Sequence, residues 1–125
     1  MNELLAEWQE RLFLQSWRIV LRPKCKPDDM ESQDCFGCTD WTEESKTARI
    51  DIVDPSCLTD RIVPFDFEKT LVHELLHLKF SLLSTNGDDM QSRYVHQMID
   101  EMARAFVDAK RYCADGERKM DDNET

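Results

Sequence analysis

The sequence has no long apolar run and no recognisable export signal. Its 125 residues contain no stretch approaching the roughly 18 apolar residues that cross a bilayer. The first residues, MNELLAEWQERLFLQSW, mix acidic and apolar side chains and lack the basic segment and small-residue cleavage site of a signal peptide. We therefore expect a cytoplasmic protein that has no membrane partner.

The sequence has fewer basic than acidic residues: 16 Lys and Arg against 26 Asp and Glu, which gives a net charge of −10. A long electrostatic contact with nucleic acid phosphates needs the opposite balance, so we expect no nucleic-acid partner. The same charge raises the alternative of an acidic protein that mimics nucleic acid. That alternative ranks low, because the acidic residues do not form long runs within the folded part.

The number of cysteines is odd, which disfavours a disulfide framework in a chain without an export signal. The five are Cys25, Cys35, Cys38, Cys57 and Cys113. CFGC gives Cys35 and Cys38 the spacing used by zinc knuckles and redox motifs, and Cys25 and Cys57 are available as two further ligands. Their spacings match no standard zinc ribbon, so reduced thiols are the main interpretation and a second zinc site is the alternative. Cys113 is expected to be a small packing residue.

The length favours a single domain over residues 1–115, followed by a flexible acidic tail at 116–125. Hydrophobic periodicity predicts helices at 3–14, 66–84 and 90–113 and strands at 17–22 and 48–53. Pro23 and Pro55 are the expected strand stops, and the irregular stretch 23–44 leaves room for one hairpin strand. The predicted fold class is α+β, with a small, mainly antiparallel sheet, an N-terminal helix and two longer helices packed against the sheet.

The two longer helices differ in their apolar faces. Asp66 is a good N-cap for the first, and Asn86-Gly87 supplies its stop signal. Apolar residues cover most of its circumference, so we expect it to be buried on more than one side. Asp88 or Asp89 can cap the second helix. The predicted apolar stripe of this second helix consists of Val95, Met98, Ile99, Met102, Phe106 and Ala109.

The first of these helices contains LVHELLHLKF, residues 71–80, in which His73, Glu74 and His77 form the pattern H-E-x-x-H. Positions i and i+4 are neighbours on one helix face, so both imidazoles can address one ion. Glu74 lies beside them, where a carboxylate can take a proton from metal-bound water. The competing interpretation is a chance match on a core helix. Burying two unpaired imidazoles there would be costly, which favours a metal site.

With these residues the sequence resembles the zincin metallopeptidases, and more closely their gluzincin-like and minimal single-domain members. The resemblance covers about half of the chain: the strand ARIDIV, the helix that carries HELLH, and the following helix. It implies a zinc cofactor. It also implies that residues 48–53 form the edge strand that borders the substrate cleft.

A zincin site needs a third protein ligand. Gluzincins carry E-x-x-x-D on the following helix, whereas this chain reads HQMID, with His96 and Asp100. By position, the resemblance implies that His96 is the third metal ligand and that Asp100 accepts a hydrogen bond from a ligand imidazole. Such a site is similar to the three-histidine sites of SprT-like proteins and metzincins. Glu101 is the main alternative ligand and Asp100 the next.

These residues lead to the hypothesis of a zinc metallopeptidase that hydrolyses peptide bonds through a zinc-activated water, with Glu74 as general base and His73, His77 and His96 as metal ligands. Tyr94, Arg93 or Tyr112 could supply a further transition-state donor, and sequence does not choose among them. The alternative is a zincin-like metal-binding domain without peptidase activity that acts as an interaction or regulatory module. The expected partner is a peptide or protein substrate. The short C-terminal half leaves little chain for a substrate-binding lobe, which allows for dependence on a partner protein.

Overall fold

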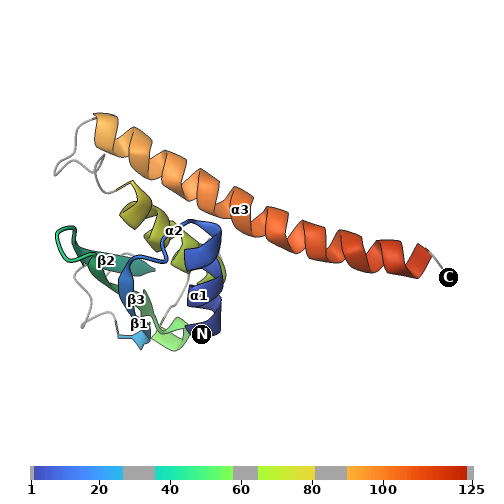
Figure 1. Ribbon diagram of the computed structural model, residues 1–125, viewed down its shortest axis with the longest axis horizontal. Coiled ribbons are helices and arrows are strands. Elements are labelled where there is room, and N and C mark those ends of the chain that lie inside the picture. The colour runs from blue at the N-terminus through green and yellow to red at the C-terminus, as the bar shows by residue number, and fades with distance from the viewer. Residues whose placement is uncertain (1, 27–35, 58–64, 81–89, 124–125) are drawn as a thin grey trace.

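The computed structural model describes residues 2–26, 36–57, 65–80 and 90–123, with side chains in the last range described from 93 to 113. In chain order the described elements are α1 (Asn2–Arg11), β1 (Arg18–Cys25), β2 (Gly37–Thr42), β3 (Thr47–Val53), the 3-10 turn η2 (Pro55–Cys57), α2 (Phe67–Lys79) and α3 (Met90–Asn123). Helix α2 lies between the sheet and α3, and the C-terminal part of α3 projects beyond the body (Figure 1). The predicted α+β class is confirmed.

The sheet has the strand order β1-β3-β2 and is mixed. β2 runs antiparallel to β3, which confirms a hairpin strand within the stretch 23–44. β1 and β3 belong to one sheet, as the sequence predicts, and they pair in parallel. The expectation of a mainly antiparallel sheet is therefore wrong for one of its two strand pairs. β2 takes the hairpin position next to β3, so β1 joins the other edge of β3 without a hairpin that would make this pair antiparallel.

β1 also runs past the predicted stop at Pro23 and ends at Cys25. Its register against β3 shifts between Arg22 and Cys25. Proline has no backbone N–H to donate, and it is tolerated on edge strands and at bulges. β1 is an edge strand with an irregularity at this point, so both conditions are met.

β3 is the central strand of the sheet, so residues 48–53 do not form the edge strand that the zincin resemblance implies. Ile50 and Ile52 have no exposed surface and pack in the main core. Asp51 points to the opposite face, where its carboxylate accepts two hydrogen bonds from Arg22, at 2.6 and 2.7 Å. One face of the sheet is thus apolar and covered by helices, whereas the other carries charged side chains and a small apolar cluster around Cys25 and Val53.

α2 begins where the sequence predicts and is buried on both sides. The Asp66 side chain caps it by accepting a 3.1 Å hydrogen bond from the backbone N–H of Lys69. The helix ends at Lys79 and not near residue 84, because Phe80 leaves helical geometry with φ −105° and ψ 25°. The predicted stop at 86–87 lies outside the described residues. The buried side chains are Thr70, Leu71, Val72, Glu74, Leu75, Leu76 and Leu78.

α3 runs for 34 residues, from Met90 to Asn123. The predicted end at residue 113 is wrong, and the backbone is helical across the expected domain boundary at 115–116. Gly116 alone is too weak a breaker in a segment that has no proline and several good helix formers. The predicted caps Asp88 and Asp89 lie outside the described residues. None of the described helices combines the length and the apolar character that crossing a membrane requires.

The buried face of α3 is rotated relative to the predicted stripe. Ile99, Ala103 and Val107 are at most 2% exposed, whereas Met98 is 51% and Phe106 38% exposed. Ile99, Ala103 and Val107 follow one another at intervals of four residues, so they lie on one face of α3, and this face packs against the core. His96 lies about one turn before Ile99 and two turns before Ala103, so it is on the same side of α3 as these buried residues. The rotation of the buried face therefore also turns His96 toward α2.

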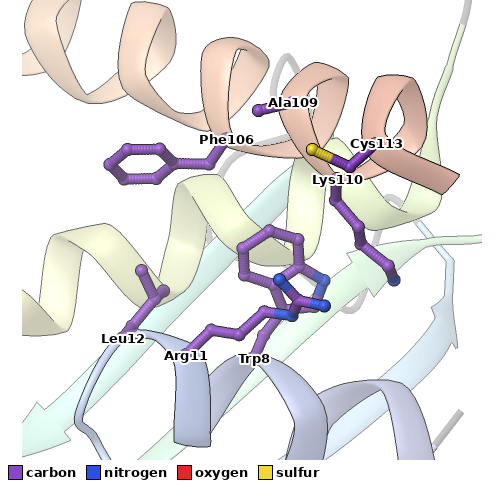
Figure 2. A pocket seen from close by; sticks show the side chains of 7 residues that line it. All are labelled: Trp8, Arg11, Leu12, Phe106, Ala109, Lys110 and Cys113. Atoms are coloured by element: carbon purple, nitrogen blue, oxygen red, sulfur yellow. The ribbon is translucent and has the colours of Figure 1, made fainter. Parts of the chain in front are cut away.

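A polar cluster joins α1, α2 and α3 where they meet. The Trp8 indole N–H donates to Glu68 Oε2 at 2.8 Å, and Lys110 Nζ donates to Glu68 Oε2 at 2.5 Å and to Glu7 Oε2 at 2.6 Å. Beside this cluster, α1 and α3 enclose a cavity of about 350 Å³. Figure 2 shows its lining residues: Trp8, Arg11, Leu12, Phe106, Ala109, Lys110 and Cys113. The cluster helps to fix the position of α3 on the body.

The rotated face of α3 predicts a clear difference between two adjacent residues. Ile99→Ala should lower the free energy of unfolding by about 2–4 kcal/mol, because it removes a buried side chain and leaves a cavity. Met98→Ala, at an exposed neighbouring position, should change it by less than about 0.5 kcal/mol. Urea unfolding of the metal-free variants measures both values. Equal losses in the two variants would contradict this orientation of α3.

Candidate metal centre

Four polar residues of α2 lie on one narrow strip of the helix. At about 100° per residue, Thr70, His73, Glu74 and His77 fall within an arc of about 100°. Leucine and valine cover most of the remaining circumference and pack on the sheet and α3. All four polar residues of the strip line a cavity of about 440 Å³, and Lys69 lines it at the margin of the strip. The burial of the apolar sides thus directs this strip toward the cavity.

The structure brings together the three histidines that the sequence indicated as metal ligands. His73 Nε2 and His77 Nε2 are 3.2 Å apart. His96 reaches them from α3, with its ring centroid 5.1 Å from that of His73 and 5.3 Å from that of His77. One nitrogen from each ring lies within 4.8 Å of the other two. Helices α2 and α3 together build this cluster.

These distances suit a small tetrahedral ion. With Zn–N bonds of 2.0–2.1 Å, two ligand nitrogens stand about 3.3 Å apart, close to the His73–His77 spacing. The His96 nitrogen needs only a small side-chain movement to reach the same spacing, and His96 is exposed enough to make it. Three imidazoles suit zinc better than calcium or magnesium, which prefer oxygen ligands. The donor set therefore fits zinc.

Burial adjusts the ionisation of the α2 histidines in the direction that metal binding requires. Loss of solvent contact, reinforced by the neighbouring His73 and His96, lowers the pKa of His77 to about 4. Burial and the nearby His96 also lower the pKa of His73, while Asp100 opposes that shift. Both rings are consequently neutral at pH 7, which is the form that coordinates a metal.

Asp100 lies behind His73, as the sequence suggested. Its Oδ1 is 3.6 Å from His73 Nδ1, which is long for a hydrogen bond but close enough for the carboxylate to attract the N–H of the ring. Its other oxygen is held at 3.0 Å by Arg104, one turn further along α3. His73 thus has Nε2 toward His77 and Nδ1 toward a carboxylate. That arrangement favours the tautomer whose Nε2 is free to bind a metal.

Glu74 is the one carboxylate on the polar strip. It is 6% exposed, and its Oε1 accepts a 2.6 Å hydrogen bond from the hydroxyl of Thr39 on β2. Burial raises the pKa of Glu74 to about 7, although the Thr39 hydrogen bond works against the rise. A carboxylate whose pKa is near neutral can both accept and release a proton at physiological pH.

The strand beside the cavity is β2, not β3. Gly37 of β2 and the preceding Phe36 line the cavity together with the α2 strip. The α3 side contributes His96, Asp100, Ala103 and Arg104. Phe36, Gly37 and Thr39 are site residues that the sequence did not reveal, because nothing within residues 36–42 indicates that they would lie against Glu74.

The other candidate residues take no part in the histidine cluster. Glu101, the main alternative ligand, is exposed and accepts a 3.5 Å hydrogen bond from Gln97. Tyr94 and Tyr112 are 59% and 77% exposed, and neither lines the cavity.

Within the described part of the chain, the histidines form the only group of three or more side chains that could hold a metal ion. Cys113 is exposed and not a buried packing residue, and Cys35 lies outside the described residues.

No family model, curated protein or solved structure matches this chain. The inference of function therefore depends on the geometry of the cluster. The His73–His77 spacing, the Asp100 contact and the buried Glu74 are three separate observations that point to one kind of site.

The Asp100 contact predicts a specific effect on zinc affinity. Asp100→Ala should weaken zinc binding about 10- to 100-fold, because it removes the carboxylate that orients His73. Glu101→Ala removes the same charge from the next position on α3 and should leave the affinity within about threefold of the wild type, since it breaks no ligand contact. Competition with a chromophoric chelator measures both affinities. A larger loss in Glu101→Ala than in Asp100→Ala would show that the wrong carboxylate has been assigned.

Proposed function

We propose that this chain is a zinc-dependent peptidase of the zincin type, with His73, His77 and His96 holding the metal and Glu74 acting as general base. The observation that carries the proposal is the convergence of three histidines and one buried glutamate on a single cavity. A purely structural metal site needs the ligands but has no use for an acid–base group beside them.

Bound zinc would lower the pKa of a water molecule and polarise the carbonyl that this water attacks. Residues of the chain itself supply the proton transfer and the orientation of the ligands. Glu74 would accept the proton as the water attacks and would deliver it to the leaving amine. Asp100 holds His73 in orientation. Burial of the strip around Glu74 limits competing water.

The surroundings of the cavity favour an extended peptide as substrate. Among the described strands, β2 lies at the edge of the sheet and beside the cavity. A peptide that runs along β2 would pass close to the general base, because Thr39 of β2 contacts Glu74.

The compartment we propose is the cytoplasm. Cys57 and Cys113 are exposed and are not part of disulfides. Exposed thiols of this kind persist in a reducing compartment. Dependence on a partner protein stays a prediction.

The role of Glu74 gives the direct test of the peptidase. Glu74→Gln should lower kcat for a mixture of internally quenched peptides about 10²- to 10⁴-fold, because the amide cannot accept the proton. Its zinc content should equal that of the wild type. Glu101→Gln, at an exposed position outside the cavity, is the matched control and should keep full activity.

Two results would count against this proposal. Full hydrolysis by Glu74→Gln would mean that another group or a contaminant does the chemistry. A zinc-loaded wild type that cleaves none of the peptides would favour the alternative, a metal-binding module without peptidase activity.

A further inference from the structure

Strand β2 presents alternate residues to α2. Gly37 is paired with Ile52 and Thr39 with Ile50, and both isoleucines have no exposed surface. Paired residues of neighbouring strands point to the same face of a sheet. Gly37 and Thr39 therefore lie on the apolar face that packs on α2, directly opposite the polar strip.

The side chain of Thr39 makes a direct contact with Glu74. Its Oγ1 donates to Glu74 Oε1 over 2.6 Å, a short distance typical of a hydroxyl donating to a carboxylate. Threonine is branched at Cβ and restricted at χ1, so a strand threonine offers its hydroxyl in few directions. Glutamate has three side-chain torsions, and without a partner it would sample several positions. The contact restricts Glu74 to one of them.

Gly37 approaches the same carboxylate from two residues away. A Cβ at this position would stand 3.1 Å from Glu74 Cγ and 3.2 Å from Glu74 Oε2. Both distances are tighter than ordinary van der Waals contact, so any side chain here would press on the glutamate. Glycine leaves the space beside Oε2 open while Thr39 holds Oε1.

From these contacts we propose that Thr39 is a positioning residue, which fixes the Glu74 carboxylate for proton transfer, and that Gly37 keeps room beside the second carboxylate oxygen. This inference rests on the proposed peptidase function. The hydroxyl keeps its own proton throughout and donates to Oε1 while Oε2 accepts the proton from water. Displacing a catalytic group by about 1 Å can cost about 10²-fold in rate, which is why one hydroxyl matters here.

The first test compares three threonine substitutions in zinc-loaded protein. Thr39→Val removes the hydroxyl at nearly constant volume and should lower kcat about 10- to 100-fold, with KM within about threefold of the wild type. Thr39→Ser retains the hydroxyl and should recover kcat to within about fivefold of the wild type. Thr42→Val makes the same change at an exposed position of β2 and should have no effect. Zinc content should be the same in all three.

The second test needs neither zinc nor substrate. In metal-free protein, Thr39→Val should lower Tm by about 5 °C, because it leaves a buried carboxylate without its donor. In a Glu74→Met background the same substitution should leave Tm unchanged or raise it, since no carboxylate then needs the hydroxyl. An equal Tm change in both backgrounds would overturn the Thr39–Glu74 contact.

The outcomes separate this inference from the peptidase proposal. A wild type that hydrolyses the quenched peptides, with Thr39→Val as active as the wild type, would overturn the positioning role and leave the peptidase intact. A wild type without hydrolysis would overturn the peptidase and with it the catalytic purpose of Thr39. A fall in kcat that Thr39→Ser reverses, together with the background-dependent Tm, supports the positioning role.

Discussion

The packing of α2 on two sides is the constraint on which the rest of this structure depends. The sheet covers one side of the helix and α3 another, and a nearly continuous apolar surface of leucine and valine fills both contacts. A helix held in this way can neither rotate nor slide without exposing its core residues. The strip that faces the cavity is therefore fixed in direction, and it carries two histidines and a glutamate.

The chemistry of the strip follows from its partial burial. Loss of solvent makes a charged imidazole and a charged carboxylate less favourable, so it lowers the histidine pKa values and raises that of Glu74. The two effects act together, since they leave the imidazole nitrogens of His73 and His77 neutral and bring the pKa of Glu74 close to neutral pH. Asp100 and Thr39 then act on individual residues, the first on His73 and the second on Glu74. Each comes from a different element, so the site depends on α3 and β2 as much as on α2.

The sequence predicted those parts of the site that a local pattern can encode. The i, i+4 spacing of His73 and His77 and the cap at Asp66 are properties of a single helix, and the structure has both. His96 lies beside His73 and His77 because α3 packs on α2. The sequence suggested this packing but could not establish it. Thr39 and Gly37 could not be predicted, because their role depends on which strand forms the edge of the sheet. The parallel pairing of β1 and the central place of β3 were missed for the same reason, since both depend on contacts between distant segments.

We propose that one metal ion binds to the three histidines. X-ray absorption at the zinc edge, on protein that carries one equivalent of zinc, tests this claim most directly. We expect nitrogen and oxygen neighbours at about 2.0–2.1 Å, with the multiple-scattering pattern of imidazole and no sulfur. Sulfur neighbours at about 2.3 Å would place the zinc on cysteines and would contradict the claim, as would a protein that binds no zinc.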